Sequence, residues 1–184
     1  MLAKEATSTH DDHTLPAEVE GNFDVAKQAQ NLLSLMTDEQ YQFVAAPYLQ
    51  SSIGQHMRHI LDVYHALMAW PDSDFIDYDA RRRAHPVETD FTIAQTEWDA
   101  IAEWLANITP ASINMALRVN GEVSLTHHAP SITASTLGRE LAFVASHAVH
   151  HFALIRVSLG VQDIKTDASF GLAPATATFC RGEN

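Results

Sequence analysis

The chain has 184 residues, 46% of them hydrophobic and 18% charged, an ordinary composition for one globular domain that can bury a core. Its formal net charge of −12 disfavours nucleic acid and anionic membrane surfaces as partners, because both require a basic surface. The single cysteine, Cys180, excludes an internal disulfide and is typical of a reducing cytoplasm.

The polar N-terminus predicts a leader over residues 1–20, followed by a single domain over residues 21–184. This leader lacks the apolar centre of a signal peptide, and we find no apolar run of membrane-spanning length. We therefore expect a cytoplasmic protein that does not bind membranes.

A first helix is predicted over residues 23–36, where apolar residues recur at helical spacing. Thr37 follows this helix, and Gln40 stands at the capping-box position three residues later. The pair indicates a short helical turn between the first helix and the second.

The second long helix is predicted from Ser52, which begins another capping-box pattern, to Trp70, which a proline follows. His56 falls inside the apolar arc of this helix, and His59 lies at the edge of that arc. One or two histidines of this helix are therefore expected to face the interior.

Residues 71–90 form a long connection that carries the basic run Arg81–Arg83. The run has two interpretations: it holds an anionic group of a substrate, or it forms internal ion pairs. A third helix is predicted over residues 92–107. Apolar residues then alternate on both sides of Asn120-Gly121, which predicts a small β-hairpin with its turn at this pair.

The longest predicted helix covers residues 135–160, with a hydroxyl residue at its start and Gly160 at the position after its end. The fifteen residues between Glu140 and Arg156 include no Asp, Glu, Lys or Arg. Apolar side chains occur on nearly every face, so we expect this helix to be buried among other helices. The irregular tail, residues 170–174, predicts a turn that packs on them.

His147 and His151 are four residues apart and therefore share one face of this helix, with Cβ atoms about 5–6 Å apart. This spacing allows two imidazoles to bind one metal ion. The alternative is that protein hydrogen bonds satisfy both rings, since an unpaired buried polar group costs about 1–3 kcal/mol. Glu140, two turns before His147, is a candidate general base or hydrogen-bond acceptor; a salt bridge with Arg139 or Arg83 is the alternative.

These elements predict an all-α fold: a four-helix bundle with a long crossover between helices 2 and 3 and a small β-hairpin before the last helix. A histidine from the second helix and the pair from the last helix would supply three nitrogen ligands, leaving positions for water or substrate. Such ligands suit Zn²⁺, Ni²⁺, Fe²⁺ or Cu²⁺ and do not choose among them.

Four segments resemble the DinB/YfiT-like superfamily of bacterial four-helix-bundle proteins: SSIGQHMRHILD, IDYDARRRAHPVETD, STLGRELAFVASHAVHHFAL and FGLAPATATF. The resemblance extends from about residue 23 to the C-terminus. In that superfamily three histidines bind a divalent metal, one from the second helix and two from an H-x-x-x-H pattern in the last.

The resemblance implies that His59, His147 and His151 are the metal ligands, because His59 precedes the Ile-Leu-Asp segment that marks the second-helix ligand. His56 and His150 are the neighbours that would replace a ligand if the alignment were shifted. Many members of the superfamily carry a further histidine where this chain has Val63.

Most members have no known activity, and those characterised resemble thiol-dependent transferases or isomerases, many of them homodimers. The resemblance therefore implies a homodimeric, metal-dependent transferase that joins a low-molecular-weight thiol to a small electrophile, with Zn, Ni or Fe as cofactor. A metal-dependent hydrolase and a non-enzymatic, metal-stabilised binding or scaffold bundle remain as alternatives. In a fourth reading the histidines hydrogen-bond one another and no metal binds.

Overall fold

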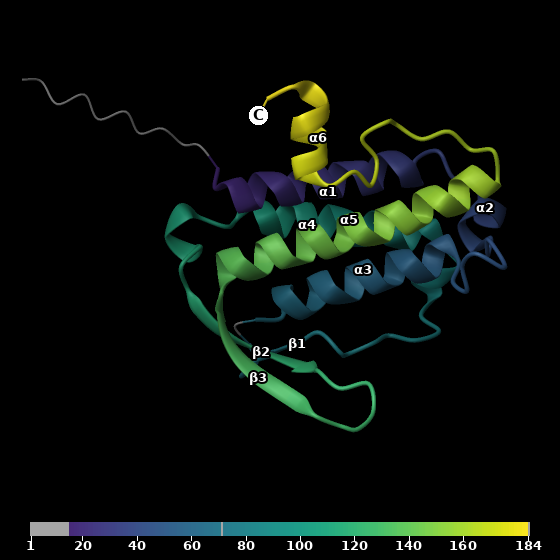
Figure 1. Ribbon diagram of the computed structural model, residues 1–184. Coiled ribbons are helices and arrows are strands. Elements are labelled where there is room, and N and C mark those ends of the chain that lie inside the picture. The colour runs from purple at the N-terminus through teal and green to yellow at the C-terminus, as the bar shows by residue number, and fades with distance from the viewer. Residues whose placement is uncertain (1–14, 71, 184) are drawn as a thin grey trace, which may run out of the picture.

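The computed structural model describes residues 15–70 and 72–183. In this part of the chain the fold is mostly helical, with a small three-stranded sheet (Figure 1). The elements in chain order are α1 (Ala17–Leu33), α2 (Asp38–Gln42), α3 (Ile53–Met68), β1 (Ile76–Asp77), the 3-10 helix η1 (Pro86–Glu88), α4 (Phe91–Ala106), the 3-10 helix η2 (Pro110–Ser112), β2 (Ala116–Glu122), β3 (Pro130–Thr136), α5 (Leu137–Val161) and α6 (Pro174–Arg181).

The core lies among the long helices α1, α3, α4 and α5, which run side by side in Figure 1. α1 and α3 each contact both α4 and α5. Their apolar faces supply the largest fully buried side chains, among them Trp98, Tyr64 and Phe152. Because burial of these faces is the main source of stability, it also fixes how α3 and α5 face each other.

The beginnings of the first helices follow local sequence rules. Both predicted capping boxes are present: Thr37 with Gln40 at α2, and Ser52 with Gln55 at α3. In each, the hydroxyl accepts the backbone N–H of the glutamine, and the glutamine side chain accepts the backbone N–H of the hydroxyl residue. α1 begins at Ala17 rather than at residue 23, so residues 17–20 belong to this helix and not to the predicted leader. Residues 1–14 of that leader lie outside the described residues.

The predicted hairpin is present, but its predicted turn at Asn120-Gly121 is wrong. β2 continues through this pair, with Asn120 opposite Ile132 in β3, and the connection spans residues 123–129. The longer register leaves Leu117 buried (4% exposed), and β1, which was not predicted, pairs with β2 in parallel. Burial and pairing on both edges of β2 therefore outweigh the turn preference of Asn-Gly.

α5 also extends beyond its predicted end. Gly160 is helical, and the left-handed backbone conformation after the helix belongs to Asp163, with φ of 56°. The tail then returns to α5, where Gly171 (φ 68°) comes so close that a Cβ atom would lie 2.7 Å from the backbone nitrogen of Ala153. The predicted packing of the tail is thus confirmed, and its final part forms α6.

Candidate metal centre

Three histidines from two helices meet where α3 packs against α5. His59 of α3 and His147 and His151 of α5 each present a ring nitrogen, and these nitrogens lie within 4.8 Å of one another. His147 and His151 share a face because they are one helical turn apart. The buried apolar residues of both helices hold the two backbones in contact, so the three rings are brought together by the core.

Each ring of this His59–His147–His151 triad contacts the other two. The Nε2 atoms of His59 and His147 are 3.0 Å apart. The ring centroid of His59 lies 4.8 Å from that of His147 and 4.7 Å from that of His151, and the centroids of His147 and His151 are 4.7 Å apart. The convergence of these side chains agrees with the arrangement that the sequence predicted.

The two neighbouring histidines lie outside this group. His56 is buried, and its Nδ1 lies 3.1 Å from Nδ1 of His151. The Nε2 of His56 is buried without a hydrogen-bond partner in the described part of the chain. His150 is exposed, with its ring centroid 5.3 Å from that of His151. His56 therefore contacts the triad from one side, through His151.

All three imidazoles of the triad are held in the neutral form. Burial, followed by the positive charge of Arg81 and by His147, lowers the pKa of His59 to about 4. Burial and the neighbouring histidines lower the pKa of His151 to about 3, and burial also lowers the pKa of His147. A neutral imidazole keeps the lone pair that binds a metal ion.

The donor set fits a divalent cation. Two nitrogens bound tetrahedrally at 2.0–2.1 Å from a metal are about 3.4 Å apart, close to the 3.0 Å between the Nε2 atoms of His59 and His147. The three ring nitrogens all lie within 4.8 Å of one another, so the widest pair has to approach by about 1.4 Å to bind one ion. Three protein nitrogens leave further coordination positions for water or substrate.

Comparison with known proteins agrees with this site. The chain matches the family model of the DinB superfamily over residues 24–155, a segment that includes all three histidines. The chain belongs to the DinB superfamily. This assignment confirms the resemblance seen in the sequence segments around His59 and His147.

One curated relative of this DinB chain is FK506-binding protein 5 of Rhizopus delemar, with 28% identity over 101 residues. The matched segment is 55% of this chain and 26% of that protein, so the chain spans about a quarter of the relative's length. No solved structure gives a significant match.

The three arginines of the basic run beside the site have different surroundings. Arg82 forms ion pairs with Asp62 of α3 (2.6 Å) and Glu97 of α4 (2.8 Å), which confirms the ion-pair interpretation for this residue. Burial works to raise the pKa of Glu97, but hydrogen bonds from His65 and Arg82 outweigh it and lower that pKa to about 2. Arg83 is exposed. Arg82 thus ties the crossover between α3 and α4 to both helices.

Arg81 faces a different environment. Its guanidinium donates hydrogen bonds to the carbonyl oxygens of Tyr78 and Ala80, and it forms no ion pair with the described residues. Its charge contributes to lowering the pKa of both His59 and His147. A cation without an ion pair in the described part of the chain therefore lies near the triad.

Glu140 is buried one turn before Phe143 of α5 and is not a member of the triad. Its carboxylate accepts hydrogen bonds from the hydroxyls of Tyr78 (2.8 Å) and Ser135 (2.5 Å). Among the described residues it has no salt bridge, so the predicted pairing with Arg139 or Arg83 is wrong. The hydroxyls of Tyr78 and Ser135 take the place of the expected arginine, because the β1–β2 pairing brings Tyr78 to α5.

Tyr78 is the neighbour of the site that sequence reasoning missed. Its ring centroid lies 5.0 Å from that of Phe143, which in turn lies 5.8 Å from that of His147. Burial, followed by the charge of Glu140, raises the pKa of Tyr78, so its hydroxyl stays protonated. No local pattern marks Tyr78, since its position depends on a strand pairing between segments about forty residues apart.

Proposed function

We propose that this DinB-superfamily chain binds one divalent metal ion through His59, His147 and His151. The observation that carries the proposal is the convergence of their ring nitrogens within 4.8 Å. The depressed pKa values support it, because protons do not compete for these nitrogens at neutral pH. A divalent ion bound there would supply Lewis acidity, which lowers the pKa of a thiol or a water molecule. Three imidazoles do not by themselves choose among divalent metals; we expect Zn, Ni or Fe.

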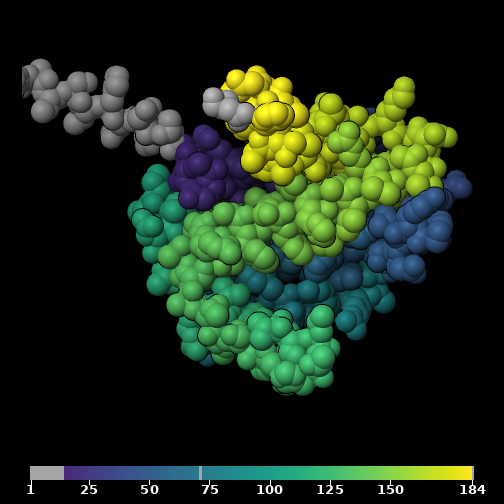
Figure 2. All heavy atoms as spheres, in the orientation of Figure 1, coloured from purple at the N-terminus to yellow at the C-terminus, as the bar shows by residue number. Residues whose placement is uncertain are grey.

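Our preferred activity is transfer of a low-molecular-weight thiol to a small electrophile. Arg81 supports it, because a guanidinium near the triad favours an anionic nucleophile over its neutral acid. Tyr78, whose hydroxyl donates to Glu140, lies beside Phe143, which in turn is the aromatic neighbour of His147. Figure 2 shows the surface hollowed between α5 and the hairpin, next to the helices that carry the triad. This hollow suits a small substrate.

We also propose the arrangement that accompanies this function: a four-helix bundle of α1, α3, α4 and α5, with the crossover between α3 and α4. The mutual contacts of these helices support it. By length and composition alone α5 could cross a membrane, but core helices of soluble proteins are often as long and as apolar, and 33% of its most apolar stretch is buried. Val157 (47%) and Val161 (45%) are exposed on α5. These features favour a cytoplasmic homodimer in which α5 meets its copy.

The test of metal binding is elemental analysis of purified protein after incubation with Zn²⁺, Ni²⁺ or Fe²⁺ and removal of excess. We expect one equivalent of metal in the native chain and in His127→Ala, whose exposed histidine lies in the β2–β3 connection. His59→Ala, His147→Ala and His151→Ala are each expected to lose it. Equal metal content in native protein and all three triad variants would contradict the proposal.

The activity is tested separately, with thiol and electrophile in the presence and absence of metal. We expect thiol-dependent turnover only in the metal-loaded native protein. Turnover of ester or amide substrates without thiol would favour the hydrolase. Stoichiometric metal binding with neither turnover would favour the scaffold. Full turnover of metal-free protein contradicts a metal-dependent enzyme of either kind.

A further inference from the structure

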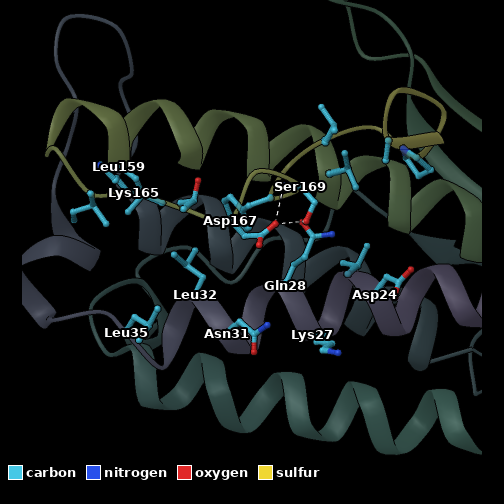
Figure 3. A pocket seen from close by; sticks show the side chains of 18 of the residues that line it. Asp24, Lys27, Gln28, Asn31, Leu32, Leu35, Leu159, Lys165, Asp167 and Ser169 are labelled. Carbon is cyan, nitrogen blue, oxygen red and sulfur yellow. Dashed lines mark hydrogen bonds between the residues drawn. The ribbon is translucent and has the colours of Figure 1, made fainter. Parts of the chain in front are cut away.

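A cavity of about 650 Å³ lies between α1, the C-terminal end of α5 and the tail that leads to α6 (Figure 3). None of the triad histidines lines it. Its volume falls within the range of about 300–1,000 Å³ that is typical of small-molecule sites. The proposed metal centre, which faces α3, does not account for this cavity.

The inner wall of the cavity is apolar. Leu32 of α1, Leu159 of α5 and Phe170 of the tail are all buried, and all three line it. The tail is held in place where the amide of Gly171 donates a 3.0 Å hydrogen bond to Gln28 of α1. Two helices and the tail therefore form a fixed apolar recess rather than a loose surface groove.

The charges that line the cavity are opposite in balance to those of the chain. Acidic residues outnumber basic ones by 23 to 11 in the sequence, but Lys27, Lys165 and Arg181 line the cavity against only Asp24 and Asp167. Two of the three lysines of the chain are therefore at this one place. Because Arg181 is paired with Glu183, the cations of this lining that remain for a ligand are the two lysines, whose ammonium groups pair with anions.

Among these cations, Lys165 is the one available beside the apolar end of the cavity. It lies next to Leu159 in Figure 3, whereas Lys27 lies at the other end together with Asp24. Arg181 is paired with Glu183. The nearby Asp167 accepts the backbone N–H of Ser169 at 2.8 Å and the Ser169 hydroxyl, so its carboxylate is engaged in a turn. Lys165 is exposed and forms no ion pair within the described residues.

We propose that this cavity binds an anionic amphiphile, namely a small molecule with an apolar body and one carboxylate group. The apolar body lies against Leu32, Leu159 and Phe170, where it removes apolar surface from water. The carboxylate meets the ammonium group of Lys165 at the rim. This site is separate from the triad and does not depend on the proposed metal.

The test is isothermal titration of the full-length protein with decanoate, below its micelle concentration, against decyltrimethylammonium, which has the same chain and the opposite charge. We expect saturable 1:1 binding of decanoate and at least tenfold weaker binding of the cation. Chelation of metal is expected to leave the Kd for decanoate unchanged. Absence of saturable binding, equal affinity for both probes, or loss of binding on chelation would each overturn the proposal.

Two charge reversals locate the site. Lys165→Glu is expected to weaken decanoate binding at least tenfold. Arg118→Glu makes the same change of charge on the exposed surface of β2, away from the cavity, and is expected to keep the native Kd. Both residues are exposed, so neither exchange disturbs the core. An equal effect of the two variants would show that net charge, and not this cavity, governs binding, and would refute the assignment.

Discussion

The Nε2 atoms of His59 and His147 lie 3.0 Å apart, across the contact between α3 and α5. At this distance two lone pairs would repel, so without a metal one ring donates its N–H to the other. The same two nitrogens are the ones that a metal ion would bind. The site thus has two alternative ways to join the helices, by a shared proton or by a shared cation.

Metal binding is expected to stabilise the fold, because the three nitrogens converge only in the folded chain. At a free metal concentration one hundred times the Kd, the stabilisation is about 2.7 kcal/mol. Calorimetric melting with and without a chelator should therefore show a lower Tm for the chelated native protein. His147→Ala is the control, whose Tm should not respond to chelator. An unchanged Tm in the native protein would argue against a folded-state metal site.

The metal-free protein is expected to lose stability as the pH falls below 6.5. The pKa of His59 in the fold is about 4 and that of His151 about 3, whereas unfolded histidine titrates near 6.5. Between these values the unfolded chain binds more protons, so the free energy of unfolding decreases as the pH falls. Because both rings are partly exposed, we expect a loss of roughly 1–3 kcal/mol.

Urea unfolding between pH 7 and pH 5 measures this loss, in a window where most carboxylates are still ionised. His59→Phe removes one of the titrating rings and should make the dependence on pH shallower. A steeper dependence in that variant, or none in the native protein, would contradict the assigned direction of the pKa shifts.

His56 is expected to position His151 rather than bind metal itself. Its Nδ1 lies 3.1 Å from Nδ1 of His151, which leaves the other nitrogen of His151 for the metal. We expect His56→Phe to weaken metal affinity by about 10–100-fold without abolishing it, as is usual when the partner of a ligating histidine is removed. Competition titration with a metal indicator measures the Kd. His150→Phe, at an exposed position, should keep the native value; equal effects of the two would exclude a positioning role.

Asp62 is expected to stabilise the crossover. It is buried and accepts from Arg58 and Arg82, both at 2.6 Å, so it joins α3 to the connection that carries Arg81. Asp62→Asn leaves both cations without this charge, and we expect a loss of about 2–3 kcal/mol, reduced by the partial exposure of the arginines. Urea denaturation measures it. Glu103→Gln, exposed on α4, should change stability by less than about 0.5 kcal/mol; similar values would refute the role of Asp62.

Several features of the protein follow from short stretches of sequence. The capping boxes at Thr37 and Ser52 need only a hydroxyl and a glutamine three residues later. The shared direction of His147 and His151 needs only one turn of helix. Residues a few positions apart set these features, so the sequence by itself determined them.

Tertiary structure decided the features that join distant segments. Asn120-Gly121 is a strong turn signal, but pairing with β1 and burial of Leu117 keep it inside β2. Helical periodicity left the choice between His56 and His59 open, and both rings approach α5: Nε2 of His59 lies 3.0 Å from that of His147, and Nδ1 of His56 lies 3.1 Å from that of His151. Among the described residues, His59 is the one whose ring nitrogen lies close to those of both His147 and His151. Local rules act over about one helical turn, whereas burial of apolar faces between α3 and α5 sets which side chains meet, and that depends on the whole core.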